Sequence, residues 1–321
     1  YRIGGPGPLD IIAGRNVDLG TSVGVTSVGN TQNPALPAAG AGVLVMAGLV
    51  SPPDYAAFTQ AYLADSDVYQ AQLAQFLAQY PEATGGSPID RFKSLPAAAQ
   101  QRFLLQVLFS ELQASGVAAA DSANKDYSRG FAAINILFPG SLESANGGDL
   151  NMLLSRIATL SGGDISLVVP TGLINAGAAD TSAISKDTSQ LGIVVQGGGN
   201  IDAYLRGDFN VNQSRVFTLD GGDILVWSSK GNIDAGRGAK TAIAAPPPIV
   251  SIDPKTGAVN LVFPPAIAGS GIRAAVTTPG KAPGSVYLFA PQGVVNASDA
   301  GIGSQGTLTI GASQVLGATN I

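Results

Sequence analysis

The stretch GDILVWSSKGNIDA, from Gly222 to Ala235, decides the fold, because the chain repeats it twice without a gap. The other copies are GDISLVVPTGLINA, from Gly163 to Ala176, and GSVYLFAPQGVVNA, from Gly284 to Ala297. Apolar and variable residues alternate in the first half of each copy, and a Gly precedes the second half. Such alternation gives a strand one buried face and one outward face. Each copy therefore predicts a short strand, a turn and a second short strand.

Some equivalent positions in the three copies are predicted to lie in the interior, and others are predicted to form turns. The interior positions are Ile165, Leu167, Ile224, Val226, Val286 and Leu288. The turn positions are Asp164, Gly172, Asp223, Gly231 and Gly293. Stacked coils of this kind bury a continuous apolar column and pair each strand with the coils above and below. The fold class we predict is mainly β, a right-handed parallel β-helix in which Ile165, Ile224 and Val286 share one column.

The spacing of the copies suggests how many coils separate them. Their first residues, at positions 163, 222 and 284, lie 59 and 62 residues apart. A coil of about 20 residues would fit three coils into either interval. Weaker copies at 199–212, 9–19 and 306–310 extend the pattern towards both ends of the sequence.

Residues 53–140 depart from this pattern and predict an α-helical insertion. The segment is rich in Ala, Gln, Leu and aromatic residues, and Tyr69, Leu73 and Phe76 recur at helical spacing. The same spacing recurs within 105–112 and 131–138, so we expect about four helices. The predicted organisation is solenoid coils over 1–52, the insertion over 53–140 and further coils over 141–321.

Residues 244–284 are rich in Pro and Gly and predict an excursion from the last group of coils. Val250 to Ile252 and Val259 to Val262 flank the turn signal Pro254-Lys-Thr-Gly257. We expect a hairpin-like excursion or one elongated coil.

The composition excludes several function classes. The chain has no His and no Cys, which rules out Ser-His-Asp triads, Cys nucleophiles and the usual zinc sites. Its net charge of −5 provides no basic face for a nucleic acid. The long uncharged stretch 21–53 is apolar only from Val43 to Val50, so we expect a buried strand there and no membrane span. The start at Tyr1, without a signal peptide, predicts a processed product or a fragment.

The run NQSRVFTLDGGDILVWSSKGNIDAGRGAKT, from Asn212 to Thr241, resembles a segment typical of filamentous-haemagglutinin-family outer-membrane and surface proteins. DYSRG at 126–130, LFPG at 137–140 and DAGIG at 299–303 resemble the same module, so the similarity covers nearly the whole chain. The resemblance implies a Gram-negative bacterium, two-partner secretion and a β-helical fibre at the cell surface or released from it.

Three Gly-rich motifs look like ligand loops but predict turns. Gly301 to Gly306 matches G-x-G-x-x-G, yet a strand follows where a dinucleotide site needs a helix. Gly236 to Thr241 lacks the Gly that precedes Lys in a phosphate loop, and Gly197 to Asp202 lacks the tandem Gly pattern of calcium repeats. Because Ser285 takes the position of Asp164 and Asp223, a side chain accepting a turn N–H explains this position better than a metal ligand. We expect no cofactor and no metal.

Carboxylate-based cleavage of a polysaccharide is the enzymatic alternative, and it needs two acids about 5 to 9 Å apart. The candidates are Asp202, Asp208, Asp220 and Asp234, with Arg206 and Arg215 nearby in sequence. No pattern places them on one face, so we predict no catalysis. The outward positions Trp227, Tyr204 and Tyr287 could stack on a sugar or pack under the helical insertion, and we favour packing.

We therefore predict a structural or adhesive extracellular surface protein, and the alternative is a polysaccharide-active or glycan-binding β-helix. A possible glycan or host-surface receptor is left open. Strand-like copies near both ends lack a polar cap, and an open solenoid end exposes unpaired N–H and C=O groups. The chain is then either part of a longer solenoid or, as we favour, a subunit that self-associates head to tail into a filament.

Overall fold

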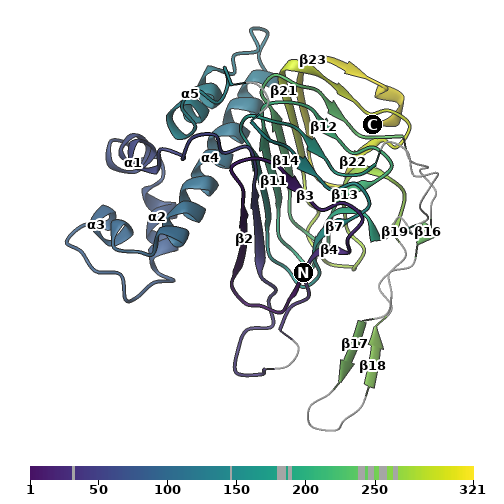
Figure 1. Cartoon of the computed structure of the whole chain (residues 1–321), viewed down its shortest axis with the longest axis horizontal. Helices are drawn as coiled ribbons and strands as arrows, with labels where there is room; N and C mark the ends of the chain where they lie inside the picture. Colours follow the sequence, from purple (N-terminus) through teal and green to yellow (C-terminus); the bar gives the residue numbers. More distant parts are fainter. Residues whose placement is uncertain are drawn as a thin grey trace. The chain divides into compact units, whose positions relative to one another are not determined.

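The computed structural model describes residues 1–30, 33–144, 147–178, 186, 190–237, 243–244, 249–252, 259–262 and 267–321. The chain forms two compact units. Tyr1–Val50 and Ala145–Ile321 make a β-solenoid, and Ser51–Ser144 make a helical unit. Mainly parallel sheets with a helical insertion were predicted, and both are present (Figure 1).

The solenoid has three walls, which follow one another in each coil. The first wall is a seven-stranded sheet of β1 (Arg2–Ile3), β4 (Gly24–Ser27), β7 (Arg156–Thr159), β10 (Gly192–Gln196), β13 (Arg215–Leu219), β20 (Gly271–Ala275) and β22 (Ile302–Ser304). The second wall contains β2 (Pro8–Ile12), β5 (Gly42–Met46), β8 (Ile165–Val169), β11 (Ile201–Leu205), β14 (Ile224–Ser228) and the first halves of β21 (Val286–Asn296) and β23 (Leu308–Leu316).

The third wall contains β3 (Val17–Asp18), β6 (Leu150–Asn151), β9 (Ile174–Asn175), β12 (Phe209–Asn210), β15 (Ile233–Asp234) and the second halves of β21 and β23. Neighbouring strands in all three walls pair in parallel. We call the turn from the first wall to the second the first corner, and the turn from the second wall to the third the second corner. The third corner is the turn from the third wall to the first wall of the next coil.

The interior is a set of apolar columns that run through the coils. Ile165 pairs in register with Ile201, Ile201 with Ile224, and Ile224 with Val286. Leu167, Val226 and Leu288 align in the neighbouring column. All six residues named for the repeat interior are fully buried. Each such side chain contributes roughly 1.5–3 kcal/mol through burial, so the columns are the main source of stability.

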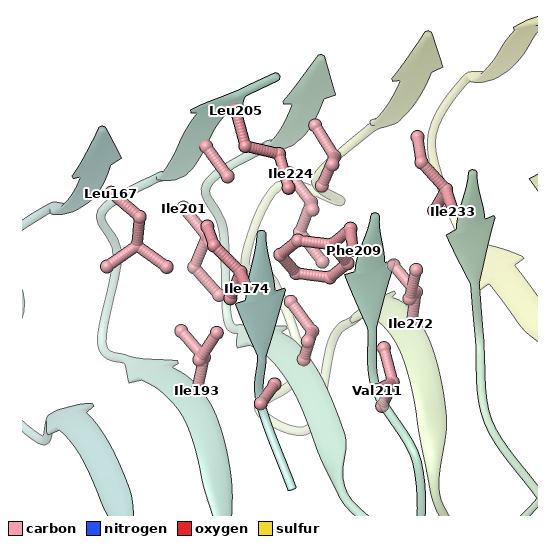
Figure 2. Close-up of a cluster of buried hydrophobic side chains, with 14 of the residues drawn as sticks. Leu167, Ile174, Ile193, Ile201, Leu205, Phe209, Val211, Ile224, Ile233 and Ile272 are labelled. Carbon is pink, nitrogen blue, oxygen red and sulfur yellow. The ribbon is translucent and has the colours of Figure 1, made fainter. Parts of the chain in front are cut away.

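Figure 2 shows how the three walls meet in this interior. Ile193 and Ile272 enter from the first wall, Ile201 and Ile224 from the second, and Phe209 from the third. These residues belong to one buried hydrophobic cluster.

The predicted count of three coils in each interval is wrong. One strand, β11, lies between Ile165 and Ile224, and Ile224 is the direct neighbour of Val286. The extra residues lie in the third corner, between β9 and β10 and between β15 and β20. A corner can lengthen without disturbing the stacked strands, because the entropy cost of closing a loop rises only slowly with its length.

The excursion between β15 and β20 contains antiparallel strands. β17 (Ile249–Ile252) pairs with β18 (Val259–Val262), and β16 (Ile243–Ala244) pairs with β19 (Ile267–Ala268). The pairing of β17 with β18 is the hairpin that the sequence indicated. The turn signal expected at 254–257 lies outside the described residues.

The repeated glycines of the second corner are needed for space rather than for an unusual φ. A Cβ on Gly293 would lie 1.9 Å from the carbonyl oxygen of Gly231, and one on Gly231 would lie 2.2 Å from the carbonyl carbon of Gly207. A Cβ on Gly172 would lie 2.0 Å from the carbonyl oxygen of Gly148. Successive coils therefore touch backbone to backbone at this corner, which only Gly allows.

The helical unit contains α1 (Tyr55–Thr59), a π-helical turn (Gln60–Ala64), α2 (Gln70–Leu77), α3 (Pro88–Lys93), α4 (Ala97–Ala120) and α5 (Ser128–Leu137). The estimate of about four helices did not include α3, because this helix is only six residues long and begins at a Pro, which the helical interior disfavours. Pro88 in fact starts this helix, and Ser87 caps it by accepting the N–H of Asp90.

The longest helix, α4, forms the centre of the helical unit. It is long and apolar enough to cross a membrane by length and composition, but 61% of its apolar window is buried, as in the core helix of a folded domain. Glu111 of α4 accepts two hydrogen bonds from Arg129, at 2.6 and 2.7 Å, and one from the hydroxyl of Tyr69. Burial alone would raise the pKa of Glu111, but these hydrogen bonds hold it below its usual value.

We predict that Ile201→Ala lowers the free energy of unfolding by about 2–5 kcal/mol, because it opens a cavity in the middle of a column. Leu308→Ala, in the partly buried last strand of the same column, is the matched control and should cost less. Urea denaturation followed by circular dichroism measures both. Equal losses for the two variants would contradict the stacked-column account.

Candidate functional site

Polar side chains form a ladder on the outer face of the third wall. Ile174, Phe209 and Ile233 point inwards, so the residue that follows each of them points outwards. We call this outer row the amide ladder; it comprises Asp18, Asn151, Asn175, Asn210, Asp234 and Asn296.

Hydrogen bonds join the first four rungs of the amide ladder to one another, and the last two rungs to each other. The Nδ2 of Asn151 donates to Oδ1 of Asp18 at 2.9 Å, and the Nδ2 of Asn175 donates to Oδ1 of Asn151 at 2.8 Å. Asn210 donates in turn to Asn175 at 3.1 Å, and Asn296 donates to Asp234 at 3.4 Å. The ladder therefore fixes an array of amide and carboxylate groups along the solenoid axis.

A second row, the corner ladder, links the coils at the first corner. Oδ1 of Asp164 accepts the N–H of Asn200 at 2.8 Å, and Oδ1 of Asn200 accepts the N–H of Asp223 at 2.9 Å. Asp223 accepts the N–H of Ser285 at 2.7 Å, and the Ser285 hydroxyl accepts the N–H of Thr307 at 3.2 Å. An oxygen acceptor is what this position requires, which accounts for Asp, Asn and Ser there.

Asp202 lies on the outer face of the second wall, between the coils that carry Asp164 and Asp223. Burial, together with the negative charges of Asp164 and Asp223, raises its pKa to about 8. Asp202 is therefore largely protonated at neutral pH.

The four acids considered for catalysis are distributed over different parts of the coil. Asp202 lies on the second wall and Asp234 on the third. Asp208 accepts the N–H of Asn232 at 2.7 Å in the second corner. Asp220, in the first corner, accepts the N–H groups of Thr277 and Thr278, which hold its pKa below its usual value although burial opposes them. The structure thus does not bring the four together.

Of the two arginines considered with these acids, Arg215 is buried, with its guanidinium 5.8 Å from the ring centre of Phe217. Arg206 follows β11 at the second corner. Among the described residues, no group of three or more acidic, His or Cys side chains is placed to hold a metal ion.

The aromatic candidates differ in exposure. Trp227 and Tyr204 have no exposed surface, so neither is available as a platform for a sugar. The indole N–H of Trp227 donates to the Ser229 hydroxyl at 3.1 Å, and its ring lies 6.1 Å from that of Phe289. Tyr287 is partly exposed.

A cavity of about 490 Å³ lies against the amide ladder at the third corner. Its polar lining comprises Asn175, Asn210, Asn212, Gln213, Asp234 and Arg237. Sequence reasoning missed this groove, although one signal was present. The next-to-last position of all three repeat copies is Asn or Asp, at Asn175, Asp234 and Asn296, which marks a polar row on the outer face.

The fold and these outer ladders define a β-solenoid protein with repetitive polar outer faces and no assembled catalytic group among the residues considered. A family model described as filamentous haemagglutinin family outer membrane protein matches residues 221–321. Comparison with curated proteins and with solved structures gives no match. The predicted resemblance is confirmed over these residues, which include the repeat copies that start at Gly222 and Gly284. The family description indicates an adhesin-like protein of the cell surface or the extracellular space.

We predict that Asp223→Leu lowers the free energy of unfolding by about 1–3 kcal/mol, because the N–H of Ser285 loses its acceptor. Asp223→Asn is the matched control and should be close to wild type, since Asn200 already takes this role in the coil below. Chemical denaturation at neutral pH measures both. A loss of equal size in the Asn variant would show that charge, and not the hydrogen bond, matters at this position.

We also predict that the protein becomes less stable as the pH rises from about 4 to about 8. An unfolded Asp loses its proton near pH 4, whereas Asp202 in the folded protein retains it up to about pH 8. Across this window the folded state binds the extra proton, so raising the pH favours unfolding. Asp202→Asn should flatten this dependence and be more stable than wild type at pH 9. Parallel slopes of stability against pH for the two proteins would exclude Asp202 as the cause.

Proposed function

We propose that the chain is a non-enzymatic structural and adhesive segment of a secreted Gram-negative surface fibre, and that solenoids of successive copies stack head to tail. The family match and the solenoid fold support the surface role. The absence of Cys from the sequence supports secretion by a two-partner route, because no disulfide can form before or during export.

The stacking proposal is based on the outermost strands at both ends of the solenoid. Among the described residues, β1, β2 and β3 each pair with a strand on one side only, and so do β22 and β23. Parallel strands use one edge for each neighbour, so each of these strands presents a row of N–H and C=O groups to a further chain.

The two ends also match each other. Leu9 and Ile11 of β2 begin the same two interior columns that Leu308 and Ile310 of β23 continue. All four side chains are only partly buried. Placing β2 of one copy on β23 of another would bury them and extend both columns. This contact joins two different surfaces, so repeated use of it produces a fibre when the rotation does not close.

The distribution of the acids supports a non-enzymatic role. Hydrolysis of a glycosidic bond needs an acid pair at a defined separation. Asp208 and Asp220 are each engaged by backbone N–H groups in different corners, and Asp234 lies on the third wall. The absence of catalysis stays a prediction, and release of reducing ends from common polysaccharides by the purified chain would contradict it.

We predict that the wild-type chain forms oligomers that grow with protein concentration, and that Leu308→Arg abolishes them. An Arg at the open end of a column would place a charge in the stacked interface. Thr309→Arg is the control, because its side chain points to the outer face of the same strand. Light scattering and electron microscopy measure assembly, and circular dichroism checks folding. A wild-type chain that stays monomeric at all concentrations would exclude head-to-tail stacking.

A further inference from the structure

The groove on the third wall has a regular floor and a charged rim. Asn175, Asn210 and Asp234 come from three successive coils, so they recur at the strand spacing of about 4.8 Å along the solenoid axis. Arg237 lies at the rim and is exposed. The cavity of about 490 Å³ falls within the range of small-molecule sites, about 300–1,000 Å³.

The ladder leaves part of the hydrogen-bonding capacity of the floor unused. An Asn side chain has two N–H donors and an oxygen with two lone pairs. The ladder uses one donor of each of Asn175 and Asn210, and one acceptor position of Asn175. Each amide can therefore still both donate to a ligand and accept from it.

The charged groups of the groove are balanced. Oδ1 of Asp234 accepts the N–H of Gly236 at 2.7 Å and the hydroxyl of Ser298 at 3.0 Å, which holds the carboxylate in place. Arg237 makes no ion pair within the described part of the chain. Among the described lining residues there is one negative and one positive charge, so this part of the lining favours neither a cation nor an anion.

We propose that this groove binds a linear, uncharged glycan that lies along the solenoid axis with about one sugar ring on each coil. Sugar hydroxyls donate and accept hydrogen bonds, which suits amides that can do both. A pyranose ring is comparable in length to the separation of two coils, so successive rings meet equivalent rungs. Leu153 supplies an apolar contact to the lining, in which the described residues include no aromatic ring. Each ring therefore binds weakly, and affinity comes from the number of rungs engaged.

The proposal makes affinity depend on ligand length. The test is isothermal titration of the full chain with neutral malto-, cello- and manno-oligosaccharides of one to six units. Oligogalacturonates of the same lengths serve as charged comparators. For at least one neutral series we expect affinity to rise from one to three units and then to level off, because three rungs line the groove. No binding by any neutral series, or binding by the oligogalacturonates alone, overturns the proposal.

Two variants locate the binding. Arg237→Gln removes the exposed guanidinium at the rim and should weaken binding about tenfold, as expected for the loss of a hydrogen bond from a charged group. Lys230→Gln is the matched control, because Lys230 is an exposed cation on the same coil but is absent from the groove lining. Equal affinities of these two variants would place the binding elsewhere and overturn the proposal.

The test is independent of fibre formation. Leu308→Arg, designed to stay monomeric, carries an intact groove, so it should bind the same oligosaccharides with wild-type affinity. Loss of binding in this folded variant would show that the glycan recognises the assembly and not the groove, which contradicts the proposal. A wild-type chain that binds glycan but never assembles would leave the groove proposal standing and remove the stacking proposal.

Discussion

The stacking of apolar side chains in register, coil upon coil, is the constraint on which the rest of this solenoid depends. Leu9, Val43, Ile165, Ile201, Ile224, Val286 and Leu308 occupy one column from one end to the other. A shift of one residue in any strand would turn its apolar side chains outwards, so the column fixes the register of every wall. Because the strands stack in register, equivalent outer residues also lie above one another, which produces the outer ladders and the groove.

The corners adapt to this constraint in two opposite ways. At the second corner, the stacked glycines from Gly207 to Gly293 bring backbones into direct contact and admit no side chain. At the third corner, long segments leave and return between β9 and β10 and between β15 and β20. The strands on either side of these segments still pair in register. The helical unit likewise leaves the solenoid at a corner, between β5 and β6. Long segments thus lie at corners, outside the stacked strands.

Much of this architecture could be predicted from the sequence, because alternation and helical spacing report directly on burial. Ile165, Ile224 and Val286 are in register, and Leu105 and Leu112 are buried in a helix. The number of coils could not be predicted from spacing, since corner insertions lengthen a coil without marking its strands. The convergence of Asn175, Asn210 and Asp234 on one groove depends on how coils distant in sequence stack. The pattern within one repeat copy does not show which coils become neighbours.

The stacking of coils places position 234 directly beside position 296, although 62 residues separate them in the sequence. The chain has no Cys, so engineered pairs can test this cleanly. In the Asp234→Cys and Asn296→Cys double variant the two Cα atoms would be close enough for a disulfide. Mass spectrometry after mild oxidation should find that bond. No bond should form in the Asn210→Cys and Asn296→Cys variant, whose positions lie two coils apart. Failure of the first pair to bond, or bonding of the second, would contradict the stacking described here.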